Sequence, residues 1–472
     1  MPTQTAATFD ALCAQVNVWM QQYQVPGVAV GVLADGAMYS AGFGVTNVDH
    51  PLLVTDETLF QIGSITKTFE ATLIMRLVEA GTLNLDAPVR TYLPGFKLRD
   101  EEVAARVTVR HLLTHTGGWP GDLFIDTGDG DDAAARYMAR MAELQQAAPL
   151  GKVFSYNNAG FYLAGHLIET VTQRSFADAV AEWVLGPLAL EQCYLRPTDV
   201  MTLRFASGHR VQDGVAVVAR PWSLPRAAWA VGGIITNVKE LLRYARFHMG
   251  DGKREDGAGL EAPQALLTPA SLRQMQSPQF PIWRDKEAVG LAWMLNDVDG
   301  FRRVSHSGGT VGQISQLALA PERGFALAVV TNCERGGELT QAAYRWCAEH
   351  FLGVKPWLPI AQHASMEKLA QYTGQYAREG VDAELRLENG QLKLHLAFTA
   401  GFPTEDTPPP PAPPPAVLDL CEEDRLIVVD GAMKDMLIDV IRDEHGQIRW
   451  VRSGRVFNPV RAAGEIESTP VR

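Results

Sequence analysis

The chain has 472 residues, of which 46% are hydrophobic and 20% charged, a composition typical of a globular protein with more than one structural unit. Its formal net charge of −12 argues against nucleic acid or an anionic membrane surface as the main partner. The sequence contains no apolar run long enough to predict a membrane span and no basic, apolar leader before the first predicted helix. We therefore expect a cytoplasmic protein, although a mature chain stripped of its leader would read the same way.

The N-terminal part predicts a helix, a β-hairpin and a second helix. An amphipathic first helix is followed by segments 27–33 and 37–45, which flank the turn Asp35-Gly36. Glycine supplies the positive φ that tight hairpin turns require. Apolar residues then recur every fourth position over residues 64–80, which predicts a long helix.

Loops and helices are expected over about residues 85–240, and strands return at 314–320 and 325–331. A final helix follows the second of these strands. The sequence thus predicts an α/β fold in which a sheet begins near the N-terminus, is interrupted by a helical region, and is completed near residue 331.

The last quarter of the chain has a different pattern. Strict alternation of polar and apolar residues on both sides of Asn389-Gly390 predicts a hairpin, and further short strands follow it. The run Pro408–Pro415 cannot form a helix interior or a central strand, so we expect an extended loop there. We predict two domains, residues 1–355 and a strand-rich accessory domain of residues 356–472.

Ser64 and Lys67 lie together in the segment FQIGSITK at the start of the second predicted helix. Residues i and i+3 share a helix face, so the lysine amine can reach the serine hydroxyl. A serine hydroxyl is a weak nucleophile until a base removes its proton, and a lysine whose pKa is depressed by burial can do so. By itself this pattern is weak evidence, because a helix cap followed by a surface lysine has the same spacing.

Tyr156 and Asn158 lie in the segment FSYNNAG, just before another predicted helix. A phenol can pass a proton between a nucleophile and a leaving group, and an amide can bind a substrate carbonyl. The plainer alternative is that the tyrosine covers the core and the asparagine caps the helix.

His306, Gly308 and Gly309 lie in the segment HSGG, directly before a predicted strand. Glycines permit close approach of backbone and substrate. The N–H of Gly309 is a candidate to complete an oxyanion hole with that of Ser64. A glycine-rich strand edge without a function is the alternative.

The three motifs S-x-x-K, Y-x-N and H-x-G, in this order and context, resemble those of the serine β-lactamase and penicillin-binding-protein superfamily. They are most similar to its class C-like branch, which holds D,D-peptidases, D-aminopeptidases and esterases. The resemblance covers about residues 10–355. It implies a β-lactamase-like α/β sandwich with an inserted all-helical region, followed by a small barrel-like C-terminal domain, and it implies no metal or other cofactor.

The resemblance also implies roles for the motif residues. Ser64 takes the place of the acylated nucleophile, Lys67 that of its base, and Tyr156 that of the proton relay. Asn158 matches the residue that steadies the substrate amide and the lysine. His306 stands where class C β-lactamases have the lysine of K-T-G, with Gly308 and Gly309 beside it as substrate-binding positions.

The histidine at this position is a departure from the β-lactamase pattern. A lysine there supplies a permanent charge for a substrate carboxylate, whereas an unperturbed histidine is mostly neutral at pH 7. Arg303, three residues before His306, is a candidate to restore the charge.

We therefore predict a serine hydrolase that forms an acyl-enzyme on a small ester, amide or peptide, either a carboxylesterase or a D-amino-acid-specific peptidase. The alternatives that stay open are a weak β-lactamase and a low-turnover binding or assembly protein. The resemblance also allows a homo-oligomer.

Two other patterns compete with this assignment. Ser307 lies in a segment similar to a G-x-S-x-G nucleophile elbow, but the first glycine is missing. His111 and His115 have the spacing of a zinc helix, but HLLTH lacks the glutamate of H-E-x-x-H and no third ligand is evident. The five cysteines, odd in number and without CxxC spacing, predict neither a metal site nor a disulfide framework.

Overall fold

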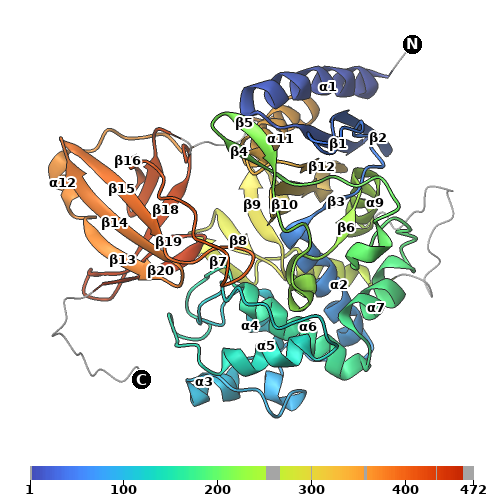
Figure 1. Ribbon diagram of the computed structural model, residues 1–472. Helices are drawn as coiled ribbons and strands as arrows, with labels where there is room; N and C mark the ends of the chain where they lie inside the picture. Colours follow the sequence, from blue (N-terminus) through green and yellow to red (C-terminus); the bar gives the residue numbers. More distant parts are fainter. Residues whose placement is uncertain (1–2, 251–265, 299, 356–358, 432, 461–472) are drawn as a thin grey trace.

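The computed structural model describes residues 3–250, 266–298, 300–355, 359–431 and 433–460. These residues form an α/β part and a closed β-barrel that lies beside it (Figure 1). The predicted domain boundary between residues 355 and 356 borders a segment outside the described residues, so the boundary itself stays a prediction.

The central sheet of the α/β part has eight strands among the described residues, in the order β2-β1-β12-β11-β10-β9-β8-β7. The N-terminal hairpin pairs with the last strand of the sheet, with Val30 opposite Val329. This confirms the prediction that the first strands are completed by strands near residue 331. The strands are β1 (Gly27–Ala34), β2 (Ala37–Gly44), β7 (Phe280–Trp283), β8 (Glu287–Val289), β9 (Met294–Val298), β10 (Phe301–Thr310), β11 (Gln313–Ala320) and β12 (Phe325–Thr331).

Helices cover both faces of this sheet, which explains why every residue of β1 is buried. Alternate residues such as Val28 and Val30 share one apolar cluster with helices α1 (Gln4–Tyr23) and α11 (Gly336–Leu352). The opposite face packs against α2 (Thr66–Glu79) and α9 (Val238–His248). Because successive side chains of a strand point to opposite faces, alternate residues of the sheet pack into two separate apolar clusters, one on each face.

The helical region predicted between the strands is confirmed, and it lies below the sheet in Figure 1. Its helices are α3 (Glu101–Arg106), α4 (Val109–Leu113), α5 (Ala133–Met141), α6 (Asn158–Thr172), α7 (Phe176–Val180) and α8 (Trp229–Gly232), with α10 (Pro269–Met275) preceding β7. Two short ribbons accompany them, β3 (Phe60–Gln61) with β6 (Ile235–Thr236) and β4 (His209–Gln212) with β5 (Val215–Val218). None of the described helices is both long enough and apolar enough to cross a membrane. The cytoplasmic location stays a prediction.

The C-terminal strands close into the barrel shown in orange and red in Figure 1. The hairpin predicted at Asn389-Gly390 joins β14 to β15, and Pro408–Pro415 lies outside any strand in the connection from β15 to β16, as expected. The barrel consists of β13 (Gly374–Arg378), β14 (Val381–Glu388), β15 (Gln391–Phe398), β16 (Ala416–Glu422), β17 (Arg425–Val428), β18 (Leu437–Arg442), β19 (Ile448–Ser453) and β20 (Arg455–Pro459), with the short helix α12 (Met366–Ala370) before it.

The barrel packs against the α/β part through both apolar and charged contacts. A small buried cluster crosses the contact and contains Ala148, Val153, Trp450 and Val456. The guanidinium of Arg425, which is 2% exposed, pairs with Glu287 of strand β8 at 2.7 Å. Truncating one partner of such a buried pair leaves an uncompensated charge, which costs about 3–5 kcal/mol. The contact therefore fixes the barrel beside the sheet edge formed by β7 and β8.

Candidate active site

Ser64 lies in a single 3-10 turn, Gly63–Ile65, that leads directly into helix α2. The helix predicted from residue 64 begins at Thr66, so the serine precedes it by two residues. Gly63 has a φ of +52°, and a Cβ added there would lie 2.5 Å from the backbone nitrogen of Gly309. Only glycine fits both conditions. The turn therefore brings the Ser64 backbone against strand β10.

The Lys67 amine lies directly beneath the serine hydroxyl. Its Nζ donates to Ser64 Oγ at 3.0 Å and to the carbonyl of Val231 at 2.8 Å. The side chain is fully buried. Burial lowers the pKa of Lys67 to about 7, because removal from water disfavours the ammonium form. Near neutral pH a substantial fraction of the amine is therefore unprotonated and able to accept the serine proton.

Tyr156 covers the lysine, with Lys67 Nζ 5.3 Å from the centroid of its ring. Burial raises the pKa of Tyr156 above its usual range. Its hydroxyl is buried and lies near the side chain of Ser64, which partly opposes the effect of burial on the pKa of Tyr156. The phenol therefore stays protonated at neutral pH and keeps its proton for donation.

His115 supports this tyrosine from the helical region. The two rings stack with centroids 4.4 Å apart, and His115 Nδ1 accepts the backbone N–H of Asn157 at 2.9 Å. Burial holds the pKa of His115 well below its usual range, so the ring is neutral. His111, its partner in the zinc-like spacing, accepts the N–H of Thr108 through Nδ1 at a helix N-terminus. Within the described part of the chain, no three metal-ligating side chains are grouped.

His306, Gly308 and Gly309 lie on β10 opposite Ser64, as the motif spacing predicts. A Cβ at Gly308 would lie only 1.8 Å from the carbonyl oxygen of Ile62, so the close approach requires glycine. Burial lowers the pKa of His306 to about 3, which keeps its ring neutral. His306 therefore supplies no positive charge to the site.

Asn158 makes a different contact from the one expected. The resemblance implies that it steadies the substrate amide and Lys67, whereas in the structure its Nδ2 donates to Asp122 at 2.9 Å. It is the first residue of α6, and the neighbouring Asn157 provides the cap by accepting the N–H of Gly160. Asp122 also pairs with two arginines of the barrel, Arg378 and Arg455. The amide is thus fixed by a carboxylate that the sequence analysis did not single out.

A cavity of about 500 Å³ opens over the serine. It is lined by five of the predicted residues, namely Ser64, Tyr156, His306, Gly308 and Gly309. Lys67 and Asn158 are buried and are not among the residues that line it. The barrel closes the opposite side with Arg425, Leu437, Asp439, Arg452, Gly454 and Arg455. The site is therefore completed by the C-terminal domain.

The turn between β19 and β20 brings the barrel closest to the predicted catalytic residues. The carbonyl of Gly454 accepts the N–H of Tyr156 at 2.8 Å, and the Arg455 guanidinium lies 4.9 Å from the Tyr156 ring centroid. Gly454 has a φ of +68°, a conformation that favours glycine, so the sequence is consistent with a turn here. The sequence does not indicate that this turn contacts Tyr156. Roughly three hundred residues separate the two segments in sequence, so no local signal connects them.

Glu70 is a second residue that the sequence analysis missed. It lies one helical turn after Lys67 on α2, is fully buried, and both of its carboxyl oxygens have no hydrogen-bond partner among the described residues. Burial raises the pKa of Glu70 well above its usual range. Its i+3 spacing from Lys67 was visible in the sequence, but the segment reads equally well as an exposed helix face.

The family model described as Beta-lactamase matches residues 9–349, and the chain belongs to this family of serine hydrolases. Penicillin-binding protein 4 of Amycolatopsis lactamdurans is 34% identical over 379 residues, which cover 79% of this chain and 96% of that protein. The unguisins hydrolase ungD' of Aspergillus campestris is 27% identical over 337 residues, covering 67% of this chain and 60% of that one. A crystal structure of SurE with D-Leu superposes with a TM-score of 0.74 at 25% identity and covers 96% of this chain and all of that one.

Proposed function

We propose that this protein hydrolyses ester or amide substrates through an acyl-enzyme on Ser64. The observation that carries the proposal is the 3.0 Å contact between Ser64 Oγ and the buried amine of Lys67, whose pKa of about 7 suits it to act as a base. The nucleophile and the proton donor Tyr156 line one cavity large enough for a small substrate.

The proposed reaction begins when Ser64 Oγ attacks the substrate carbonyl and its proton passes to neutral Lys67. The N–H groups of Ser64 and Gly309 stabilise the oxyanion that forms. As the tetrahedral intermediate collapses, the phenol of Tyr156 protonates the leaving group and Lys67 returns a proton to the phenolate. Water then attacks the ester carbonyl and gives a proton to the same pair, which passes it to Ser64 Oγ as the carboxylic acid product leaves.

The substrate class is proposed from the relatives and from the chemistry of the site. One relative is named as a hydrolase, and one structural neighbour is a complex with D-Leu. These names favour amides or esters of D-amino acids. A neutral His306 does not provide the lysine charge of class C β-lactamases, so we expect at most weak β-lactamase activity. Simple carboxylic esters stay within the proposal.

A panel of initial rates tests the proposal. It compares p-nitrophenyl acetate and butyrate, D-alanine p-nitroanilide, a D-alanyl-D-alanine peptide and nitrocefin. We expect turnover of the D-amino-acid or ester substrates and little of nitrocefin. Wild-type protein that turns over none of these substrates above the buffer rate would contradict the proposal and favour a binding or assembly role. Size-exclusion chromatography with light scattering would test at the same time whether the chain forms the homo-oligomer that the resemblance allows.

Replacing Tyr156 with phenylalanine is expected to lower kcat by at least about 100-fold, the usual scale for loss of a general acid. The ring would still stack on His115, so folding should be preserved. Steady-state kinetics together with the melting temperature check this. A variant with wild-type turnover would remove the phenol from the reaction scheme.

A further inference from the structure

The cavity over Ser64 is positively charged although the whole chain carries a formal charge of −12. Among the described residues that line it, four are arginines and two are carboxylates. The arginines are Arg303, Arg425, Arg452 and Arg455, and the carboxylates are Glu287 and Asp439. Positive charge concentrated in a cavity favours an anionic ligand. Since His306 is neutral, one of the arginines is the candidate to bind it.

Two of these arginines are buried and paired with carboxylates. Arg425 is 2% exposed and pairs with Glu287 and Asp439. Arg452 is 4% exposed, pairs with Asp439, and donates to the carbonyls of two residues in the α/β part. Both guanidinium groups hold the barrel in place. Arg425 Nη1 has no hydrogen-bond partner among the described residues, but the charge of this guanidinium is already paired with two carboxylates.

Arg303, the candidate that the sequence analysis proposed, is held by an amide and an aromatic ring, while its Nε has no hydrogen-bond partner among the described residues. Its Nη2 donates to Asn296 at 2.9 Å, and its guanidinium lies 4.6 Å from the ring centroid of Tyr344. Tyr344 belongs to α11, which covers the face of the sheet that carries the N-terminal helix. These contacts hold the charge of Arg303 toward that helical layer.

Arg455 differs from the other three. Its side chain is 27% exposed, and its guanidinium uses Nε and Nη2 to bind Asp122. Nη1 forms no hydrogen bond with any described residue. Asp122 shares its single negative charge between Arg455 and Arg378, so this trio keeps one net positive charge. A guanidinium can offer its remaining donors to a carboxylate.

The position of Arg455 is set by contacts on both sides of it. Gly454 accepts the N–H of Tyr156, and the N–H of Val456 donates to Ser155 Oγ at 3.2 Å. These bonds hold the β19–β20 turn against the segment that carries the proton donor. The charge is therefore preorganised beside the reacting groups, which reduces the cost of binding.

We propose that Arg455, supplied by the C-terminal barrel, selects substrates that carry a free carboxylate close to the scissile bond. The proposal rests on the proposed acylation of Ser64. It assigns the barrel a direct part in substrate recognition, and it identifies Asp122 as the residue that positions the guanidinium.

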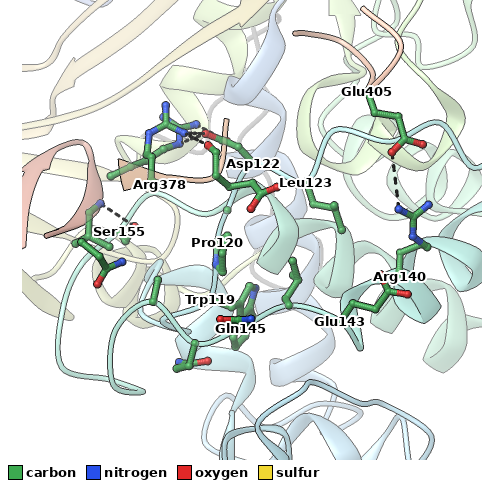
Figure 2. A pocket seen from close by; sticks show the side chains of 18 residues that line it. Trp119, Pro120, Asp122, Leu123, Arg140, Glu143, Gln145, Ser155, Arg378 and Glu405 are labelled. Carbon is green, nitrogen blue, oxygen red and sulfur yellow. Dashed lines mark hydrogen bonds and ion pairs between the residues drawn. The ribbon is translucent and has the colours of Figure 1, made fainter. Parts of the chain in front are cut away.

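Arg378 provides a matched control. It pairs with the same carboxylate of Asp122, as Figure 2 shows, but it lines a different cavity of about 610 Å³ on the far side of this ion pair. Arg455 borders both cavities, whereas Arg378 does not line the one that contains Ser64. Arg378→Gln thus removes a charge from Asp122 without removing one from the candidate active site.

The test uses two aryl phosphonates with the same acyl part, one with a carboxylate and one with a carboxamide at the same position near phosphorus. The rate of Ser64 labelling is measured by intact-mass spectrometry for wild type, Arg455→Gln, Arg455→Lys and Arg378→Gln. We expect wild type to react about 100-fold faster with the carboxylate probe, the scale of a charge-assisted hydrogen bond. Arg455→Gln should lose this preference while its rate with the carboxamide probe stays within about three-fold of wild type.

The two remaining variants separate recognition from structure. Arg455→Lys keeps the charge without the planar fork, so we expect an intermediate preference. Arg378→Gln should keep the full preference. Equal rates for both probes in wild type, or an equal slowing of both probes in Arg455→Gln, would overturn the inference. If neither probe labels Ser64 in the wild type, the result contradicts the proposed acylation itself and not only the role of Arg455. Melting temperatures identify any variant that does not fold. If Arg455→Gln does not fold, the inference is tested by comparing the two probes in wild type and in Arg455→Lys.

Discussion

Replacing Ser64 with alanine is expected to abolish the covalent adduct and to lower kcat/KM by about 10⁵-fold or more, as seen when a hydrolase loses its nucleophile. Among the described residues, Lys67 Nζ hydrogen-bonds to one other oxygen, the carbonyl of Val231, so no second hydroxyl is placed to replace that of Ser64. Intact-mass spectrometry with a serine-directed phosphonate, followed by peptide mapping, gives the readout.

Ser307→Ala is the matched control for this experiment. Ser307 lies inside the extended strand β10 and not on the strand-to-helix turn that a nucleophile elbow requires. We therefore expect Ser307→Ala to be labelled as fast as wild type. An adduct that persists in Ser64→Ala and disappears in Ser307→Ala would reverse the assignment of the nucleophile.

Replacing Lys67 with methionine is expected to lower kcat/KM by about 10³- to 10⁴-fold, the upper range for loss of a general base. Lys67→Arg should be equally impaired, because a guanidinium keeps the charge but does not deprotonate. In wild type, kcat/KM should rise with pH through about 7 and level off above it, because only the neutral amine accepts the serine proton. A pH–rate profile for the three proteins checks this, and near-wild-type activity in the Lys67→Arg variant would exclude the base role.

Glu70→Gln should move this ascending limb to lower pH. In its ionised form the Glu70 carboxylate raises the pKa of Lys67 and so opposes the effect of burial. Its removal lets desolvation act alone, which disfavours the ammonium form further. Glutamine has nearly the same shape, so packing around Gly165 should persist. A limb that stays in place, or moves to higher pH, would show that the carboxyl does not act on the lysine.

The C-terminal barrel changes how the site is understood. Sequence motifs place every predicted catalytic group in the α/β part, but one wall of the cavity over Ser64 comes from strands β17 to β20 and their connections. The buried pairs of Arg425 and Arg452 fix this wall, and Arg455 extends from it toward Tyr156. The site of the proposed reaction in the α/β part is therefore enclosed by the barrel, which by our inference also selects the substrate.

Local sequence determined the parts of this protein that depend on short-range geometry. The hairpins at Asp35-Gly36 and Asn389-Gly390 follow from turn chemistry, and the proximity of Ser64 and Lys67 follows from the i, i+3 spacing of a helical turn. Ordered motifs with their context were sufficient to identify the family, since each motif constrains a few adjacent residues.

Only the tertiary structure decided which distant groups meet. Asp122, Arg378 and Arg455 form one ion-pair group across more than three hundred residues of sequence, and nothing near any of them in the chain predicts it. The contact of Asn158 and the neutral state of His306 were decided in the same way, because both depend on what burial places around a side chain. Spacing fixes neighbours along one element, whereas charge state and specificity depend on desolvation and on packing between elements.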